Sequence, residues 1–316
     1  MFIPRLLHPG DKIAITAASS PANEKKLRAG IRALESLGLK IQVFDSCHTQ
    51  HAYLAGTDDI RLKNLHTAFA DQSIKGIFMA RGGYGAGRLL PYLDYGLIKN
   101  NPKVFVGFSD VTALHIVFNQ ICKMVTFHGP MPGANLNDEA DALTIQSLKQ
   151  MTFAQWLAPQ TVPTARTLFP GNAAGILTGG NLSLIAASLG TPFEINTRGR
   201  ILFMEEIEEE PYKVDRLFLQ LKQAGKFRDA KGIILGDFSP ETPETLNIAI
   251  QELIIPENKP TICDLPCGHT NPTLTLPLGV RVSLHPLQIH VHLQNSTGHT
   301  RFLASSQPAE NRWLRR

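Results

Sequence analysis

Cysteine is scarce in this sequence. The 316 residues contain four cysteines, at positions 47, 122, 263 and 267. They are too few and too scattered to form the disulfide framework that a secreted chain of this length would need. We therefore expect free thiols and a reducing compartment.

Charged residues are also sparse, and they form no long basic run. Charged residues make up 18% of the sequence, and lysine plus arginine outnumber aspartate plus glutamate by 31 to 27. The formal net charge of +4 is spread along the chain. A protein that follows a phosphate backbone needs a more concentrated positive surface, so we do not expect nucleic acid as a partner.

Long apolar runs are missing as well. No stretch approaches the roughly 20 apolar residues of a membrane-spanning helix. The early apolar run from Ile13 to Ala18 is too short for the core of a signal peptide, and Pro4, Pro9 and Gly10 interrupt the residues before it. We therefore expect no membrane association and a cytoplasmic location.

The amino-terminal half alternates short apolar runs with segments of helical periodicity, which is typical of a parallel sheet covered by helices. The predicted strands are Lys12–Ala17, Ile41–Phe44, Gly76–Ala80 and Val104–Gly107, and the predicted helices are Leu27–Leu37, Ile60–Phe69 and Val111–Phe118. We expect Ser20 and Pro21 to begin the first helix and Gly38 to end it. The sequence thus predicts a three-layer α/β domain over residues 1–150, with a ligand site at the carboxyl ends of its strands.

A second domain is expected after a proline-containing connection. Pro159, Pro163 and Pro170 interrupt the periodicity, so we place a linker at 151–171 and a mixed α/β domain at 172–316. In this domain we predict buried strands at Arg200–Met204 and Gly232–Gly236, a helix at Tyr212–Ala224, and alternating strands over 280–293 that turn at Pro286. The length of the chain is sufficient for two hydrophobic cores.

Ser109 lies between an apolar strand-like run and a helical run, in the segment VFVGFSDVTALHIVF. A serine on such a turn presents its hydroxyl, and the amides at the start of the helix, beginning with that of Asp110, can stabilise a developing oxyanion. The alternative is that Ser109 and Asp110 only cap the helix. The segment also lacks the second glycine of the G-x-S-x-G motif.

A glycine-rich segment, RGGYGAGR, follows the predicted strand at Gly76–Ala80. The amide of Gly82 or of Gly83 could supply a second oxyanion donor, since glycine lets the backbone approach a ligand closely. The loop could instead hold a phosphate, but its spacing matches neither G-x-G-x-x-G nor G-x-x-x-x-G-K-[ST]. Arg81 and Arg88 could bind a substrate carboxylate, or they could form ordinary surface ion pairs.

A nucleophilic serine needs a base and a carboxylate that orients it. Among eleven histidines, His269 stands out because it lies in a loop bounded by proline and glycine, and Glu205 directly follows the apolar run ILFM. Glu205 also belongs to an acidic run, and such runs are usually solvated. Cys263, Cys267 and His269 could instead bind a metal, although C-x3-C-x-H is an atypical zinc spacing.

The sequence resembles the LD-carboxypeptidase family of serine peptidases, which includes the immunity peptidase that destroys microcin C. The resemblance rests on seven segments in order: AGTDDIRLKNL at 55–65, RGGYGAGRLLPYLDY at 81–95, VGFSDVTALH at 106–115, FHGPM at 127–131, LTGGNLSLIAASLGTPFE at 177–194, ILFMEEIEEEPYKVDRLFLQLKQAG at 201–225 and GHTNPTLTLPLGVRV at 268–282. Small departures are AASS at the end of the first strand and Phe108, where relatives often have other residues.

The resemblance implies a triad of Ser109, Glu205 and His269 in a cleft between the two domains. It implies oxyanion donors at Asp110 and at Gly82 or Gly83, no cofactor, no bound metal and a homodimer. The implied reaction is hydrolysis of the L,D bond between diaminopimelate and the terminal D-alanine of a murein tetrapeptide, with Arg81 and Asn181 as substrate-binding residues.

Three other functions stay open from the sequence. An immunity peptidase acting on a peptide-nucleotide would need an aromatic surface for the base, and the sequence shows no clear one. A non-catalytic protein could use the same glycine-rich loop to bind a small ligand. A metallohydrolase would use the cysteines and His269.

Overall fold

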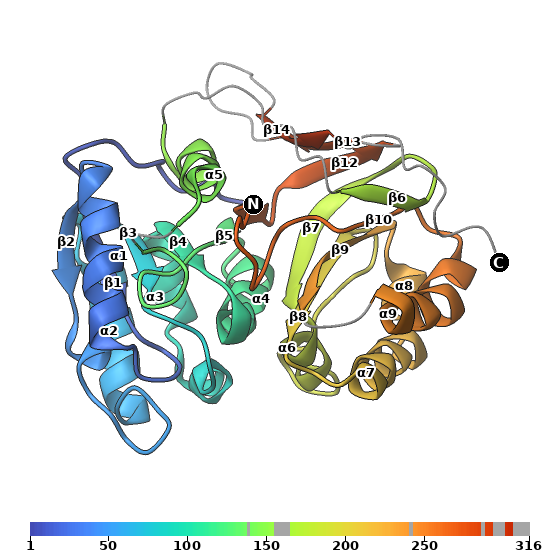
Figure 1. Cartoon of the computed structure of the whole chain (residues 1–316). Coiled ribbons are helices and arrows are strands. Elements are labelled where there is room, and N and C mark those ends of the chain that lie inside the picture. The colour runs from blue at the N-terminus through green and yellow to red at the C-terminus, as the bar shows by residue number, and fades with distance from the viewer. Residues whose placement is uncertain (138–139, 155–164, 240–242, 286–287, 293–300, 306–316) are drawn as a thin grey trace. The chain divides into compact units, whose positions relative to one another are not determined.

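The computed structural model describes residues 1–137, 140–154, 165–239, 243–285, 288–292 and 301–305 (Figure 1). The chain divides into two compact units. Unit 1 contains Met1–Leu157, Ala187–Ile195 and Asn271–Gly279, and unit 2 contains Ala158–Ala186, Asn196–Thr270 and Val280–Arg316. The predicted domain limits at 150 and 171 stay predictions, and residues 155–164 of the predicted linker lie outside the described residues.

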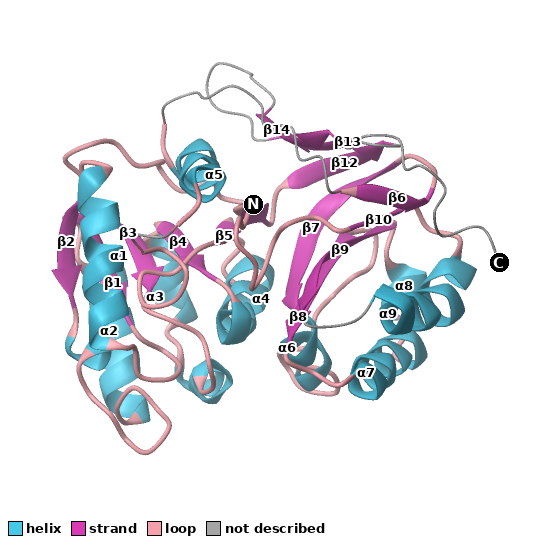
Figure 2. Cartoon of the chain, viewed as in Figure 1, coloured by secondary structure: helices cyan, strands magenta, loops and turns pink. Residues whose placement is uncertain are grey.

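Unit 1 is built on a six-stranded sheet with the order β11-β5-β4-β3-β1-β2. Figure 2 labels the strands β1 to β5 of this sheet. Five strands run parallel, namely β1 (Lys12–Thr16), β2 (Lys40–Val43), β3 (Ile74–Met79), β4 (Val104–Gly107) and β5 (Thr126–His128). The helices of this unit are α1 (Glu24–Ser36), α2 (Asp58–Ala70), α3 (Tyr95–Asn100), α4 (Thr112–Gln120) and α5 (Ala142–Thr152). The alternation of strands and helices confirms the predicted α/β class.

The predicted start of the first helix is wrong. α1 begins at Glu24, because the side chain of Asn23 accepts a hydrogen bond from the amide of Lys26 at 3.1 Å and so caps the helix. The hydroxyl of Ser20 accepts instead from the amide of Tyr84 at 3.1 Å. The predicted end is confirmed, since Gly38 follows α1 with a φ of 85°.

The edge strand of this sheet comes from a distant part of the chain. β11 (Leu276–Leu278) pairs antiparallel with β5. The residues before it are fastened to α5, since the amides of Thr273 and Thr275 donate to the hydroxyls of Thr144 and Ser147, each at 2.9 Å. The segment Asn271–Gly279, which begins two residues after His269, is part of unit 1.

Unit 2 is built on an eight-stranded sheet with the order β14-β13-β12-β7-β8-β9-β10-β6. β7 (Ala173–Asn181), β8 (Ile201–Ile207), β9 (Gly232–Ser239) and β10 (Thr261–Cys263) are parallel, and β6 (Arg166–Phe169), β12 (Arg281–His285), β13 (Gln288–His292) and β14 (Arg301–Ser305) pair antiparallel. The helices are α6 (Leu182–Ala187), α7 (Pro211–Gln223), α8 (Lys226–Asp229) and α9 (Pro243–Ala249). The predicted mixed α/β character is confirmed, while the predicted turn at Pro286 lies outside the described residues.

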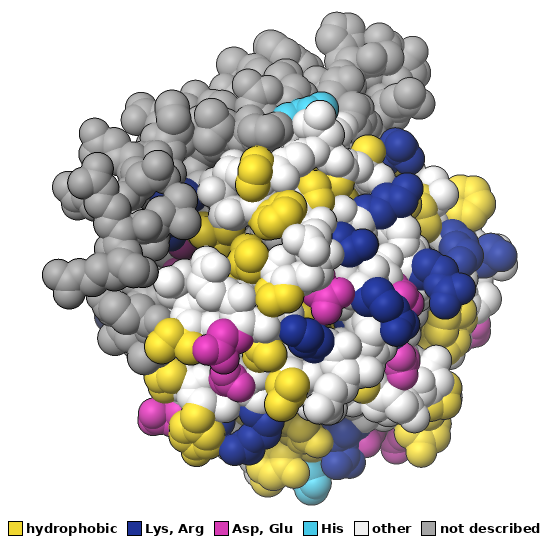
Figure 3. Space-filling model, turned by 90° about the vertical axis from the view of Figure 1, so that its right-hand side faces the viewer, with side chains coloured by type: hydrophobic (Ala, Val, Ile, Leu, Met, Phe, Trp, Pro, Cys, Tyr) yellow, Lys and Arg dark blue, Asp and Glu magenta, His cyan; other side chains and the backbone are white. Residues whose placement is uncertain are grey.

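The surface charge is mixed on the face drawn in Figure 3. Lysine and arginine side chains are interspersed with acidic and hydrophobic ones over the described part of this face. None of the described helices has the length and the apolar character needed to cross a membrane.

Candidate active site

Ser109 occupies a strained turn between β4 and α4. It begins a 3-10 turn, Ser109–Val111, and its φ is 63°, in the left-handed region that non-glycine residues rarely adopt. Such a conformation costs on the order of 1–2 kcal/mol and tends to persist where function requires it. The side chain is partly exposed, so the hydroxyl stands on a sharp strand-to-helix turn, as a nucleophile requires.

Gly82 packs directly against this serine. A Cβ atom on Gly82 would lie 2.7 Å from the Cβ and 2.8 Å from the Oγ of Ser109, and 3.4 Å from the amide nitrogen of Asp110. Gly83, with a φ of 105°, approaches Ser20 instead, because its Cβ would lie 2.4 Å from the Ser20 hydroxyl. Only glycine allows the backbone of this loop to come so close to the serine turn.

Asp110 is buried and connects the serine turn to the glycine-rich loop. Its side chain is 1% exposed, and its Oδ2 accepts from the amide of Ala86 at 2.7 Å. Burial raises the pKa of the Asp110 carboxyl, while hydrogen bonds from Ser19, Ala86 and Gly85 oppose that rise. The carboxylate is therefore occupied within the fold, whereas its backbone amide is the group predicted to face an oxyanion.

The two arginines of the glycine-rich segment differ in their contacts. Arg81 is half-buried and donates to the carbonyl of Pro21 at 3.2 Å. Arg88 is exposed and forms an ion pair with Asp58 at 2.9 Å. Arg88 thus matches the surface ion pair that the sequence left open, and a substrate contact for Arg81 stays a prediction.

Glu205 and His269 form a hydrogen-bonded pair in unit 2. Glu205 lies in β8 and is fully buried, and its Oε2 is 2.8 Å from the Nδ1 of His269. Because a carboxylate only accepts, Nδ1 carries the ring proton in the neutral imidazole and the lone pair is on Nε2. The His269 side chain is 16% exposed. This arrangement leaves the ring oriented as a general base requires.

Two glycines make room for this pair. A Cβ on Gly268, whose φ is 123°, would lie 2.5 Å from the Oε2 of Glu205. A Cβ on Gly236 in β9 would lie 3.1 Å from the Cβ of Glu205. Burial raises the pKa of the Glu205 carboxyl, and the His269 ring counteracts that rise. The carboxylate is thus held in a site where its charge interacts strongly with the imidazole.

The neighbouring carboxylate, Glu206, has a different role and was not singled out from the sequence. It is 4% exposed and accepts from the side-chain amide of Asn181 at 2.8 Å and from the amide and hydroxyl of Ser183 at 2.8 and 2.7 Å. Glu205 instead contacts the ring of His269, so the two adjacent carboxylates have different main partners. In the sequence, Glu206 looked like part of a solvated acidic run. The apolar run ILFM directly before Glu205 was the one sequence feature that indicated burial.

Asn181, at the end of β7, is buried and uses both ends of its side chain. Its Nδ2 donates to Glu206, and its Oδ1 accepts from the amide of Leu184 at 3.2 Å. The side chain thereby joins the end of β7 to β8 and to the start of α6. A direct contact between Asn181 and substrate stays a prediction.

The cysteines near His269 have little thiolate character. Cys263 and Cys267 are both buried, and burial raises the pKa of each thiol. A metal binds the thiolate form, so a raised pKa disfavours coordination. Among the described residues, no group of three or more histidine, cysteine or acidic side chains is arranged to hold a metal ion.

The chain matches known proteins over nearly its whole length. The profile of the LD-carboxypeptidase N-terminal domain matches residues 13–129, and that of the LD-carboxypeptidase C-terminal domain matches residues 174–284. A protein of Bacillus subtilis named as a probable murein peptide carboxypeptidase is 40% identical over 295 residues, which cover 89% of this chain and 91% of that protein.

Solved structures share the fold. The microcin C7 self immunity protein MccF superposes with a TM-score of 0.82 and 26% identity, covering 90% of this chain and 96% of that one. A muramoyltetrapeptide carboxypeptidase from Oxalobacter formigenes superposes with a TM-score of 0.78 and 30% identity, covering 87% of this chain and 94% of that one.

Proposed function

Because the chain belongs to the LD-carboxypeptidase family of hydrolases, we propose that it is a serine-type carboxypeptidase acting on murein tetrapeptide. The bond cleaved joins the L-centre of diaminopimelate to the terminal D-alanine. The observation that carries this proposal is the 40% identity, over 89% of the chain, to a protein named as a probable murein peptide carboxypeptidase. The strained serine turn and the hydrogen-bonded pair of the partly exposed His269 and the buried Glu205 supply the groups that the chemistry needs.

In the proposed mechanism, Ser109, His269 and Glu205 act together. The Nε2 of His269 takes the proton of the Ser109 hydroxyl as its oxygen attacks the carbonyl carbon, and Glu205 stabilises the imidazolium that forms. The imidazolium then protonates the leaving amine of D-alanine, and water hydrolyses the ester to regenerate Ser109. The amides of Asp110 and of Gly82 or Gly83 stabilise the oxyanion.

Two features of the chain support a joint action of these residues. Gly82, Ser109 and Asp110 pack within one unit, so the nucleophile and its proposed oxyanion donors are assembled locally. His269 is the next-to-last residue of the unit 2 segment Asn196–Thr270, and the chain enters unit 1 at Asn271. The histidine is thus two residues away in sequence from the unit that contains the serine.

The substrate carries a terminal carboxylate, which a basic group should bind. Arg81 is the first candidate, because it is half-buried next to Gly82 and its guanidinium donates to the carbonyl of Pro21, with no acidic partner among the described residues. Asn181 is the second candidate, through a rearrangement of its buried side chain. Replacing Arg81 by methionine should raise KM more than it lowers kcat.

We also propose that the enzyme works in the cytoplasm as a homodimer, as the family resemblance implies. Light scattering coupled to size-exclusion chromatography tests the dimer: a mass of twice 34.7 kDa supports it, and the monomer mass contradicts it. Fractionation of cells that produce the protein tests the location.

The test of the reaction is mass spectrometry of purified murein tetrapeptide after incubation with the enzyme. We expect the loss of one alanine, and no loss from the matched peptide that ends in L-alanine. The Ser109→Ala variant should stay folded and lose nearly all turnover. Unchanged tetrapeptide with the wild-type enzyme contradicts the proposed substrate, and full turnover by Ser109→Ala contradicts the proposed nucleophile.

A second candidate function is hydrolysis of a peptide-nucleotide, favoured by the structural match to the microcin C7 self immunity protein. An aromatic surface that the sequence did not reveal adds support. Tyr53 and Tyr84 are 60% and 55% exposed, and their rings form an edge-to-face pair with centroids 5.7 Å apart. Because Tyr84 lies two residues after Gly82, a base could stack near the serine turn. A comparison of kcat/KM for tetrapeptide and for an aminoacyl sulfamoyl adenosine distinguishes the two functions.

A further inference from the structure

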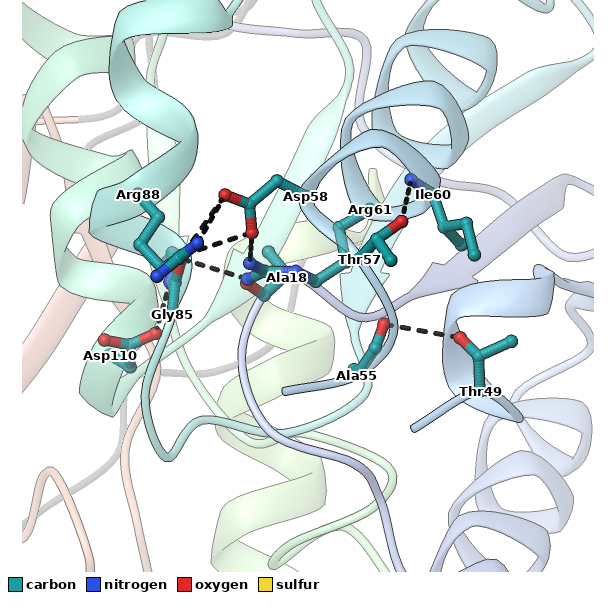
Figure 4. Close-up of polar contacts among 11 residues, drawn as sticks. Ala18, Thr49, Ala55, Thr57, Asp58, Ile60, Arg61, Gly85, Arg88 and Asp110 are labelled. Atoms are coloured by element: carbon teal, nitrogen blue, oxygen red, sulfur yellow. Dashed lines mark hydrogen bonds and ion pairs between the residues drawn. The ribbon is translucent and has the colours of Figure 1, made fainter. Parts of the chain in front are cut away.

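Arg61 is a fully buried arginine in the first turn of α2, outside the proposed triad. Its side chain is 0% exposed, which is rare for a cation and costly unless the charge is paired and hydrogen-bonded. The guanidinium pairs with Asp58 and donates to the carbonyl of Ala18, and it donates to the carbonyl of Gly85 at 3.0 Å (Figure 4). The arginine thus joins α2, the end of β1 and the glycine-rich loop.

The peptide between Gly85 and Ala86 is held from both sides. Its carbonyl oxygen accepts from Arg61, and its N–H donates to the carboxylate of Asp110 at 2.7 Å. The carbonyl and the N–H of a trans peptide point in opposite directions, so a cation and an anion fix the plane of this one peptide. Hydrogen bonds to charged groups are stronger than neutral ones, especially where water is excluded.

The local backbone is shaped for this contact. Gly85 has a φ of 132°, and a Cβ there would lie 2.6 Å from the Nη1 of Arg61. Any other residue would both strain the backbone and push the guanidinium away. A Cβ added to Gly87, in the same loop, would meet no atom within 4 Å. The glycine at 85 is therefore tied to the arginine, and the glycine at 87 is not.

We propose that Arg61 is a positioning residue for the oxyanion site. It holds the Gly85–Ala86 peptide against the carboxylate of Asp110, and this contact fixes the spacing between the glycine-rich loop and the amide that follows Ser109. The inference rests on the proposed function, because it assumes that these amides stabilise an oxyanion. The competing explanation is that Arg61 only stabilises the fold through Asp58 and Ala18.

The experiment compares Arg61→Lys with a matched control, Arg28→Lys. Lysine keeps the charge but lacks the planar fork that reaches several acceptors at once. Arg28 lies on α1, where its side chain is 68% exposed and pairs with Glu24 at 2.9 Å. A displacement of about 1 Å at a catalytic group can cost about 10²-fold in rate, so Arg61→Lys should lose about 10²-fold in kcat with little change in KM. Arg28→Lys should match the wild type.

A second pair of variants tests the contact without removing the arginine. Gly85→Ala should reduce kcat by a similar factor, and Gly87→Ala should not. All rates are expressed per active site, counted by labelling with a serine-directed fluorophosphonate, so that a loss of folded protein does not imitate a loss of rate. Values of kcat per labelled site within about threefold of the wild type for both Arg61→Lys and Gly85→Ala overturn the proposal. Failure of both variants to fold also overturns it, since it shows a structural role.

The rate constant of fluorophosphonate labelling separates this inference from the proposed substrate. Labelling needs a nucleophilic serine and an oxyanion site but no murein peptide. Slower labelling of Arg61→Lys and Gly85→Ala supports the positioning role of Arg61 even if the tetrapeptide is not hydrolysed. If the wild-type enzyme hydrolyses the tetrapeptide and these variants are labelled at the wild-type rate, the positioning role of Arg61 is wrong and the proposed function stands. If the wild-type enzyme is not labelled, both fall.

Discussion

Replacing Glu205 by glutamine should separate activity from stability. Glutamine has nearly the same shape as glutamate but no charge, so the variant removes the negative partner of the His269 ring and little else. In the wild type, the Oε2 of Glu205 accepts from Nδ1 of His269 at 2.8 Å, and the carboxylate is fully buried. We expect a large loss of kcat without a loss of folding stability.

The expected loss of activity follows from the charge that develops on His269. In the transition state the imidazole becomes an imidazolium, with its charge centre about 4 Å from that of the carboxylate, and such a pair interacts by about 4 kcal/mol at an effective dielectric constant of about 20. A loss of about 4 kcal/mol corresponds to about 10³-fold in kcat. The value of KM should change little, because the charge is absent in the ground state.

The expected gain or maintenance of stability follows from the pKa of Glu205. Burial raises the pKa of this carboxyl in the folded protein above its ordinary value of 4.5. A carboxyl whose pKa is higher in the folded state opposes folding once the pH exceeds 4.5, because the unfolded chain then loses its proton more readily than the folded protein does. Glutamine removes that cost, so the free energy of unfolding of Glu205→Gln at pH 7.5 should equal or exceed that of the wild type.

The assay is steady-state hydrolysis together with urea unfolding at pH 7.5, and Glu206→Gln is the matched control. Glu206 accepts from Asn181 and from both donors of Ser183, so glutamine there faces donors with its own amide and should cost about 1–3 kcal/mol of stability. A kcat for Glu205→Gln within tenfold of the wild type refutes the proposed role of the carboxylate. A destabilisation above about 2 kcal/mol refutes the reasoning from its pKa.

Three further predictions follow from other residues. Gly82→Ala should abolish turnover, because its Cβ would lie 2.8 Å from the Oγ of Ser109. Gly87→Ala should keep its turnover, because a Cβ there meets no atom within 4 Å. Equal kcat values for the two variants contradict the close approach of Gly82 to Ser109. Burial lowers the pKa of His115 from 6.5 to about 4. The free energy of unfolding should therefore fall by about 3 kcal/mol as the pH drops from 6.5 towards 4, because the unfolded chain takes up the proton first. If His115→Gln shows the same pH dependence in urea unfolding, His115 is not its cause. Hydrolysis should continue in EDTA, and its loss, restored by added zinc, favours the metallohydrolase.

Much of the fold could be predicted because its central strands are short, apolar and separated by helices. The predicted strand at Val104–Gly107 matches β4 residue for residue, and the predicted helix at Tyr212–Ala224 differs from α7 by one residue at each end. Local patterns do not reveal which distant segments pair. β11 joins the sheet of unit 1 through contacts with β5 and α5, and no periodicity near Leu276 indicates that partner.

The sequence indicated the types of residue at the site better than the surrounding contacts that hold them in place. The motif around Ser109 indicated a strand-to-helix turn, but not the left-handed φ of that serine or the close packing of Gly82 against it. Ser20 followed by proline is typical of a helix start, yet the hydroxyl binds the amide of Tyr84, because a contact across the fold replaced the local cap. Arg61 in a helical segment looks like a surface residue, and only the three-dimensional structure shows that it is buried.

The central claim is that His269 activates Ser109, and the most direct measurement is the rate at which a fluorophosphonate labels Ser109 with and without the imidazole. A general base contributes about 10²- to 10⁴-fold, so His269→Ala should label at least about 100-fold more slowly than the wild type at pH 7.5, with the label on Ser109 by peptide mapping. Equal labelling rates for the two folded proteins, or a label on another residue, would contradict the account.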